Sequence, residues 1–265
     1  MSTLLEEMKN SLEVRELGSI LPHEQVVQAN VLRLKQIMLN IGTIVDPLLV
    51  DKKTGVLLDG HHRLKVLEHI ECPRAVCQTV DYTSKDIHLG TWYPTISLNP
   101  EQIYKLDSLK HEKVDFEAGM ETINKFKAPF MVATKTKGYH LINPGTYSLN
   151  EMIAEQTRIV SLLEKGTVEY IAEVEAQRYL DENKSVLYRR PYTKEEVVKM
   201  AEMHTPLPPK STRHLIPGRI LRLNMKLGWL HKPKEETTKE LHDMLTTRVL
   251  GGNVRRYYES VIVIY

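Results

Sequence analysis

A short run near residue 60 combines an acid, a glycine and three basic side chains. An apolar strand would end on Asp59, and the chain would then turn through Gly60 into a helix. The helix would open with His61, His62 and Arg63. The first N–H groups of a helix have no intrahelical partner and favour an anion, so the turn predicts a phosphate site. A carboxylate beside phosphate needs a magnesium ion or a proton, and this combination suggests catalysis.

Glu24 is the second candidate for chemistry. It follows Pro22, which is expected to open a helix, so Glu24 would lie in the first turn. An acid there is stabilised by the helix dipole, and that alone would explain it. Alternatively, the carboxylate could orient a hydroxyl and accept its proton late in phosphoryl transfer, which needs positioning more than a strong base. The residues alone leave both interpretations open.

The third candidate is a basic loop that follows three prolines. The loop Lys210–His214 holds an ammonium, two hydroxyls, a guanidinium and an imidazole, which could clamp a carboxylate or phosphate. A solvated surface loop is the alternative. Trp92 is equally open, as a packing residue or a ligand contact. Zinc is not favoured, because His61 and His62 are adjacent and no third histidine lies at helical spacing.

The elements that must position these residues are mixed, which predicts an α+β protein. The periodicity predicts strands at 12–20, 44–50, 56–59, 74–80, 130–142 (a hairpin), 168–174, 185–189 and 257–265. It predicts helices at 22–40, 60–70, 100–113, 149–164, 195–204 (with a capping box at Thr193) and 235–248. Thr91–Pro94 is the expected boundary, which gives domains 1–90 and 91–265.

Composition narrows the functional classes. The net charge of +2 gives no broad basic field for nucleic acid, and no run of about 18 apolar residues could span a membrane. Two cysteines and no visible signal peptide suggest a reduced, cytoplasmic protein. Neither a P-loop nor a G-x-G-x-x-G motif is present, so a nucleotide must bind by other means.

Taken together, four segments resemble the free L-serine kinases of the ParB/sulfiredoxin-like superfamily. They are Pro22–Gln28, Asp59–Arg63, Thr91–Pro94 and Pro209–His214, and they occur in the family's order. The resemblance covers about residues 12–217. The archaeal archetype uses ADP, whereas the tail 219–265 is more similar to ATP-using bacterial relatives that make O-phosphoserine for siderophores. The resemblance therefore leaves the phosphate donor open.

The resemblance implies a role for each segment. Glu24 corresponds to the catalytic glutamate that contacts the serine hydroxyl, and Asp59 would act at the transferred phosphate and magnesium, directly or through water. The donor phosphates would bind at Gly60, His61, His62 and Arg63. The serine site would be formed by Trp92, Lys210, Thr212, Arg213 and His214. Ser211 replaces the threonine expected in the archaeal pattern, which keeps a hydroxyl.

Neighbouring families fit less well. Sulfiredoxins need a cysteine in the turn that is Gly60–Arg63 here, and chromosome-partitioning relatives carry a different turn and a helix-turn-helix domain. The expected function is phosphoryl transfer from ATP or ADP, with Mg²⁺, to L-serine for cysteine or related biosynthesis, by a cytoplasmic monomer or homodimer. A ParB-like nucleotide-binding regulator and a kinase of another small hydroxyl compound are the alternatives.

Overall fold

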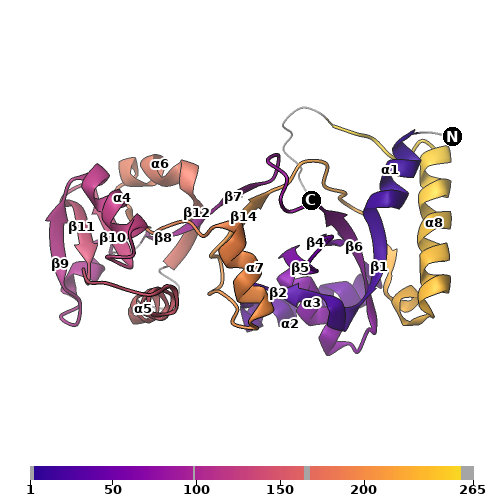
Figure 1. The fold of residues 1–265 in the computed structure, drawn as a ribbon, viewed down its shortest axis with the longest axis horizontal. Helices are drawn as coiled ribbons and strands as arrows, with labels where there is room; N and C mark the ends of the chain where they lie inside the picture. Colours follow the sequence, from indigo (N-terminus) through magenta and orange to yellow (C-terminus); the bar gives the residue numbers. More distant parts are fainter. Residues whose placement is uncertain (1–2, 98, 164–167, 258–265) are drawn as a thin grey trace. The chain divides into compact units, whose positions relative to one another are not determined.

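The structure is a computed structural model that describes residues 3–97, 99–163 and 168–257. The chain forms two compact units (Figure 1). The first unit contains the residues up to 22, residues 26–82 and the tail from 218 onward, and the second contains residues 23–25 and 83–217. The sequence instead placed the tail with the second part and the division after residue 90.

A five-stranded mixed sheet forms the centre of the first unit. Its order is β1 (Leu12–Glu16), β6 (Arg74–Val80), β4 (Leu48–Asp51), β5 (Val56–Asp59) and β2 (Leu21–Pro22). Strands β4 and β5, at the predicted strands 44–50 and 56–59, pair antiparallel, and β6 has the predicted bounds. A smaller pair joins β3 (Thr43–Ile44) to β15 (Met225–Lys226), so the tail is paired with the first unit.

Four helices cover this sheet: α1 (Thr3–Ser11), α2 (Gln28–Ile41), α3 (His61–His69) and α8 (Lys234–Leu250). Helices α1 and α8 lie side by side next to β1 (Figure 1). Short 3-10 helices η1 (Leu17–Ser19) and η4 (Leu227–His231) complete the unit. The core takes residues from every helix, including the fully buried Leu5, Val31, Leu67, Leu241 and Leu245. Helix α1 has no counterpart among the predicted elements, and the predicted strand 257–265 lies outside the described residues beyond Tyr257.

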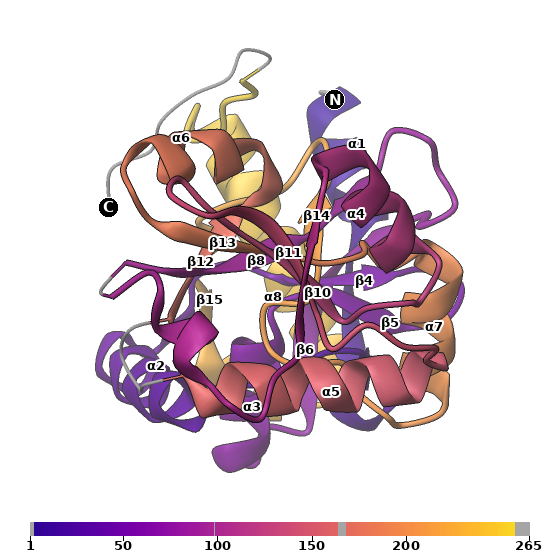
Figure 2. The ribbon, with the colours of Figure 1, turned by 90° about the vertical axis from the view of Figure 1, so that its left-hand side faces the viewer.

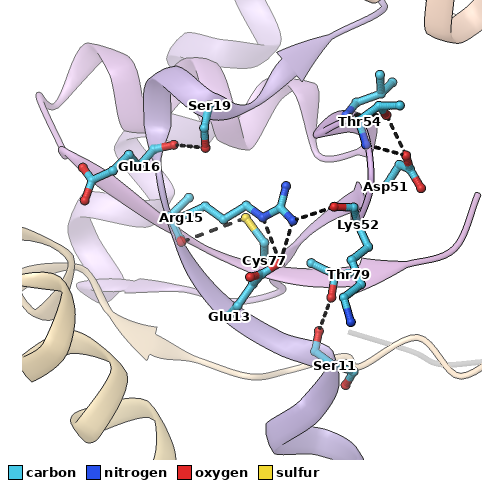
Figure 3. A network of polar contacts seen from close by, with 12 residues as sticks. Ser11, Glu13, Arg15, Glu16, Ser19, Asp51, Lys52, Thr54, Cys77 and Thr79 are labelled. Carbon is cyan, nitrogen blue, oxygen red and sulfur yellow. Dashed lines mark hydrogen bonds and ion pairs between the residues drawn. The ribbon is translucent and has the colours of Figure 1, made fainter.

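Polar contacts fix the turn between β4 and β5 (Figure 3). Asp51 accepts hydrogen bonds from the N–H (2.8 Å) and hydroxyl (2.6 Å) of Thr54. Arg15 on β1 donates to the Glu13 carboxylate at 2.9 Å and to the Lys52 carbonyl at 3.2 Å. These contacts tie the hairpin, and so the strand that ends at Asp59, to the first strand of the sheet.

The second unit is built on a six-stranded antiparallel sheet. Its order is β12 (Val168–Ala172), β8 (Trp92–Ile96), β13 (Ser185–Tyr188), β10 (Phe130–Thr134), β11 (Gly138–Ile142) and β9 (His111–Val114). Helix α5 (Leu149–Leu162) runs along one face, and α4 (Phe116–Asn124) and α6 (Ala176–Asp181) cover the other (Figure 2). Alternate residues of β10 serve the two faces: Met131 packs with α4 and α6, and Val132 packs with α5.

One helix, a two-stranded ribbon and two 3-10 helices complete the second unit. They are α7 (Lys194–Glu202), the short ribbon of β7 (His88–Gly90) with β14 (Arg213–Leu215), and the 3-10 helices η2 (Gln102–Lys105) and η3 (Glu173–Glu175). Helix α7 begins with the predicted capping box, in which Thr193 and Glu196 bind each other's backbone N–H. Within the described ranges, no helix combines the length and apolarity that a membrane crossing needs.

Two predictions for the second unit are wrong. Residues 100–113 do not form a helix: they form η2 and then β9, which pairs with β11. Thr91–Pro94 is not a connection either, because Trp92–Ile96 is an interior strand. Pro94 stands opposite Tyr170 of β12 and lies beyond the two residues that pair with β13, Thr95 and Ile96, so on the β13 side the missing proline N–H breaks no bond.

Candidate active site

Glu24 does not lie in a helix, contrary to the prediction. Helix α2 begins at Gln28, and Glu24 forms a parallel β-bridge with Leu207 instead. Leu207 donates its N–H to the His23 carbonyl and accepts the Gln25 N–H, both at 2.8 Å. Pairing with a segment about 180 residues away, rather than a helix dipole, positions this side chain.

The carboxylate of Glu24 is bound by the loop that follows Pro209. Oε1 accepts the Lys210 N–H at 2.7 Å, and Oε2 accepts the N–H groups of Ser211 (3.2 Å) and Thr212 (3.1 Å). The Thr212 hydroxyl also donates to Oε2 at 2.9 Å. Four donors approach the roughly four lone-pair positions of a carboxylate, so Glu24 and this loop form one structural unit.

Burial raises the pKa of Glu24 above its ordinary value. The Lys210 N–H, the Thr212 hydroxyl and N–H, and the positive charge of Arg189 each lower it, without offsetting the burial fully. A carboxylate with a raised pKa is a stronger base than a solvated one. This environment therefore favours proton acceptance by Glu24.

A second set of contacts approaches the same loop from Arg189. This arginine follows β13, is only 3% exposed, and donates through Nη2 to the Lys210 carbonyl. Its Nε donates at 3.2 Å to the hydroxyl of Thr91, which in turn donates to the Ser211 carbonyl at 3.1 Å. Lys210 has a positive φ of 60°, and a left-handed residue of this kind lets successive N–H groups converge on one anion.

The predicted serine-site residues lie around this loop. The Lys210 ammonium is 5.3 Å and the Arg213 guanidinium 5.5 Å from the centroid of the Trp92 ring, within cation–π range. The ring of His214 lies 5.3 Å from that of His23, and His23 Nε2 is 2.9 Å from the Thr212 hydroxyl. The second unit therefore gathers Glu24, Trp92, Lys210, Thr212, Arg213 and His214.

The predicted phosphate turn is present in the first unit. Strand β5 ends at Asp59, Gly60 is the N-cap of α3, and the first intrahelical bond is from Leu64 N–H to the Gly60 carbonyl. Gly60 has φ 107°, and a Cβ there would lie 2.7 Å from the Leu48 side chain. Glycine fits this close turn, and the N–H groups that precede Leu64 lie before the first intrahelical bond of α3.

Arg63 has a structural role that the sequence analysis did not foresee. Its guanidinium donates to the carbonyls of Asp46 (2.8 Å) and Pro47 (2.9 Å) and to the Asp59 carboxylate (2.9 Å). Arg219, from the tail, also pairs with Asp59. Burial would raise the pKa of Asp59, but these two arginines and the Gly60 N–H hold it below its ordinary value.

Both histidines of the turn lie in the first turn of α3. His62 accepts the Val27 N–H through Nε2 at 3.3 Å and so holds the start of α2, while His61 opens α3. No group of three or more metal-binding side chains (His, Cys, Asp or Glu) occurs among residues 3–97, 99–163 and 168–257.

Several residues of these clusters escaped the sequence analysis. Arg189 and Arg219 carry no local motif, Thr91 lies in the Thr91–Pro94 segment but received no role there, and the Ser211 N–H acts through the backbone, which any residue except proline supplies. For His23, a local signal was available: it directly precedes Glu24 in the polar segment Pro22–Gln25. Long-range pairing to Leu207 then brings both to the loop.

No protein-family model matches the chain. An ADP-dependent L-serine kinase from Thermococcus kodakarensis is 26% identical over 225 residues, which cover 80% of this chain and 90% of that protein. An ATP-dependent L-serine kinase from Staphylothermus marinus is 29% identical over 224 residues, covering 76% and 84%. A ParB-like protein from Sulfolobus acidocaldarius is 31% identical over 71 residues, 27% of this chain and 35% of that protein.

Solved structures agree with these sequence matches. A free serine kinase in complex with AMP has a TM-score of 0.70 at 25% identity and covers 83% of this chain and 93% of that one. SbnI from Staphylococcus aureus, with a C-terminal truncation, has a TM-score of 0.71 at 17% identity, covers 92% and 99%, and shows the fold alone. The predicted resemblance is confirmed: over most of its length this chain is similar in sequence to L-serine kinases, and it has a ParB-like α+β fold.

Proposed function

We propose that this protein is a free L-serine kinase, which transfers a phosphoryl group from ATP or ADP to the serine hydroxyl and yields O-phospho-L-serine. The observation that carries the proposal is the buried Glu24 carboxylate in its ring of loop donors, beside the cationic groups around Trp92. The L-serine kinases among the relatives support it, since they match most of the chain.

Glu24 would act as the base. Serine Oγ forms a bond to phosphorus while the bond from phosphorus to the bridging donor oxygen breaks, and the nucleotide leaves with that electron pair. The hydroxyl proton passes to Glu24, whose raised pKa favours acceptance. The serine hydroxyl would donate to this carboxylate in the same way as the Thr212 hydroxyl, which is its closest chemical match among the four donors.

The remaining second-unit residues would recognise the amino acid. Lys210 and Arg213 carry the positive charge that a substrate carboxylate or product phosphate needs, and Trp92 supplies an apolar wall beneath both. Thr212 and His214 complete the clamp. This assigns residues 91–265 the substrate-clamping role, apart from the tail that packs with the first unit.

In the first unit, the turn Asp59–Arg63 would hold the donor phosphates. This assigns nucleotide binding to the predicted domain 1–90. The N–H groups at the start of α3 are suited to phosphate oxygens, with His61 and His62 beside them. Gly60 permits close approach of the backbone, and Arg63 contributes charge while it braces the turn. The adenine contacts stay unassigned.

Magnesium would enter with the nucleotide. Asp59 is the one carboxylate of the turn, and both arginines bind its Oδ2. A site of one carboxylate plus substrate phosphates is a common way to hold Mg²⁺, so Asp59 fits an ion that the nucleotide brings, directly or through water. When bound, Mg²⁺ would neutralise charge on the transferred phosphoryl group.

The cellular setting follows as part of the proposal. Cys72 and Cys77 are both free, and burial raises the pKa of their thiols to about 11 and about 12, so they are unreactive. Free thiols fit a reducing, cytoplasmic compartment. We place the enzyme there, as a monomer or homodimer without a nucleic-acid partner, supplying O-phosphoserine for cysteine or related biosynthesis.

The proposal is tested by assaying a panel of acceptors for phosphorylation, once with ATP and once with ADP as the donor. L-serine, D-serine, L-threonine and an inositol are incubated with the protein and Mg²⁺, and products are identified by mass spectrometry. We expect phosphorylation of L-serine above all other acceptors. Phosphorylation of another acceptor alone would make it a different kinase, and nucleotide binding with no product would favour a ParB-like regulator.

A further inference from the structure

Among the residues that the structure describes, Arg189 is a buried cation with no carboxylate in direct contact. Tyr192, Tyr170, Glu24 and Tyr93 act on it electrostatically, and Glu24 is the one carboxylic acid among these four. A buried charge is expensive unless it is compensated. Glu24 is therefore the counter-charge of Arg189, although the loop backbone lies between them.

Two hydrogen-bonded chains connect the pair. In the first, Arg189 Nη2 donates to the Lys210 carbonyl, and the Ser211 N–H of the same peptide group donates to Glu24 Oε2 at 3.2 Å. In the second, Arg189 Nε donates to the Thr91 hydroxyl at 3.2 Å, which donates to the Ser211 carbonyl at 3.1 Å. The Thr212 N–H of that next peptide group donates to the same Oε2 at 3.1 Å.

Every bond in both chains points from Arg189 towards Glu24. A peptide group whose carbonyl accepts a bond from a cation becomes more polarised, so its N–H becomes a better donor to an anion. The fork of the guanidinium is what allows one side chain to begin both chains. Each chain also fixes the plane of one peptide group, and so the direction of its N–H.

We propose that Arg189 is the positioning residue of Glu24: through the peptide groups 210–211 and 211–212 it holds the loop N–H groups on the carboxylate and keeps that carboxylate ionised. The inference deepens the proposed function, because an ionised, oriented Glu24 is the base that the kinase reaction needs. Arg189 itself contacts no substrate in this account.

Other groups near the pair set the background for its titration. Tyr170 faces both Glu24 and Arg189, Tyr93 and Tyr192 face Arg189, and His23 contacts the Thr212 hydroxyl that also bonds Glu24. The tyrosines are neutral at pH 7, with their pKa values raised by burial. Loss of Arg189 would therefore leave Glu24 without its buried positive charge.

Three substitutions separate charge from geometry. Arg189→Met removes both, Arg189→Lys keeps the charge but loses the fork, and Thr91→Val removes only the second chain. Titration of the Glu24 carboxyl by carbon-13 NMR reads its ionisation directly. We expect the midpoint to rise by about 1 to 2 pH units in Arg189→Met and to move little in Arg189→Lys and Thr91→Val.

Kinetics supply the second readout. In the pH profile of kcat/KM, the acid limb should move to higher pH in Arg189→Met by as much as the Glu24 midpoint does. Activity that is lost at pH 7 should therefore return at higher pH. Arg189→Lys should lower kcat about tenfold through poorer orientation, with the acid limb in place. A merely structural role would lower activity equally at every pH.

The outcomes distinguish this inference from the proposed function. An unchanged Glu24 midpoint in Arg189→Met overturns the inference, whatever the activity. If Arg189→Met does not fold, the comparison rests on Arg189→Lys and Thr91→Val: an acid limb shifted upward in Thr91→Val, which keeps the charge, contradicts it. If the wild-type protein makes no phosphoserine but Arg189→Met still raises the Glu24 midpoint, the inference holds and the kinase proposal fails.

Discussion

At the scale of single residues, two carboxylates of this protein are tuned in opposite directions. Burial raises the pKa of Glu24, although loop N–H groups and Arg189 oppose it. Burial would also raise the pKa of Asp51, but the Thr54 hydroxyl and the N–H groups of Tyr82 and Thr54 lower it below its ordinary value. The first environment suits a base, and the second suits an acid that locks a turn (Figure 3).

Asp51→Asn tests the structural carboxylate. Because the folded pKa of Asp51 is lowered, its contribution to stability is fully present above the unfolded pKa and is lost as pH falls through the folded value. We expect the substitution to cost about 1 to 3 kcal/mol at pH 7 and progressively less below about pH 4. Urea unfolding at several pH values measures this difference.

Asp243→Asn is the matched control, because Asp243 is exposed on α8 in the same unit. It should change the free energy of unfolding by less than about 0.5 kcal/mol at every pH. A cost for Asp51→Asn that stays constant down to pH 3 would contradict the proposed role of its charge.

What the sequence could predict at this scale depended on distance along the chain. The turn around Asp59 was predictable because strand, glycine and helix start are contiguous. Glu24 was identified as a candidate, but its partners Lys210 to Thr212 are about 187 residues away, so local spacing suggested a helix dipole instead. Arg189 and Arg219 contribute single side chains from distant segments, and no local pattern marks them.

At the scale of elements, the start of α3 depends on one residue. Gly60 has φ 107°, and a Cβ would lie 2.7 Å from Leu48 and 3.2 Å from the Arg63 guanidinium. Gly60→Ala must therefore shift the turn that presents the helix N–H groups. We expect a loss of about 1 to 3 kcal/mol in stability and at least tenfold weaker nucleotide binding by calorimetry.

Gly18→Ala is the control for this substitution, since nothing lies within 4 Å of a Cβ at Gly18 and its backbone is not left-handed. It should leave nucleotide affinity within about twofold. Nucleotide binding that is unchanged in Gly60→Ala would separate this turn from the donor phosphates.

Elements with strong local signals were predicted well. The hairpin around Gly138 and the α7 capping box are both present, because turn glycines and caps act within a few residues. The helix predicted at 100–113 failed because β9 is formed by pairing with β11, which the local sequence does not report. Helix α4 was missed for a related reason: Gly119 interrupts its pattern where the backbone packs closely on Met131.

At the scale of the whole molecule, the tail belongs with the N-terminal residues. Helix α8 places Leu241 and Leu245 in the core of the first unit, and Arg219 pairs with Asp59 at the predicted phosphate turn. The tail therefore has a structural task that the sequence did not reveal. It completes the unit to which we assign the nucleotide.

Leu241→Ala measures this dependence. Leu241 is fully buried, so its truncation should cost about 2 to 5 kcal/mol and lower the melting temperature, in the absence and presence of nucleotide. Leu250→Ala, at a side chain 79% exposed on the same helix, should cost less than about 0.5 kcal/mol. Equal effects of the two substitutions in thermal unfolding would show that α8 does not stabilise the core.

The most direct test of the central claim compares O-phospho-L-serine formation by the wild type, Glu24→Gln and the exposed control Glu117→Gln, followed by phosphorus-31 NMR with ATP or ADP. We predict product with at least one donor, at least 100-fold slower formation in Glu24→Gln, and a rate within about twofold of wild type in Glu117→Gln. No phosphoserine with either donor, or an undiminished rate in Glu24→Gln, would contradict the account.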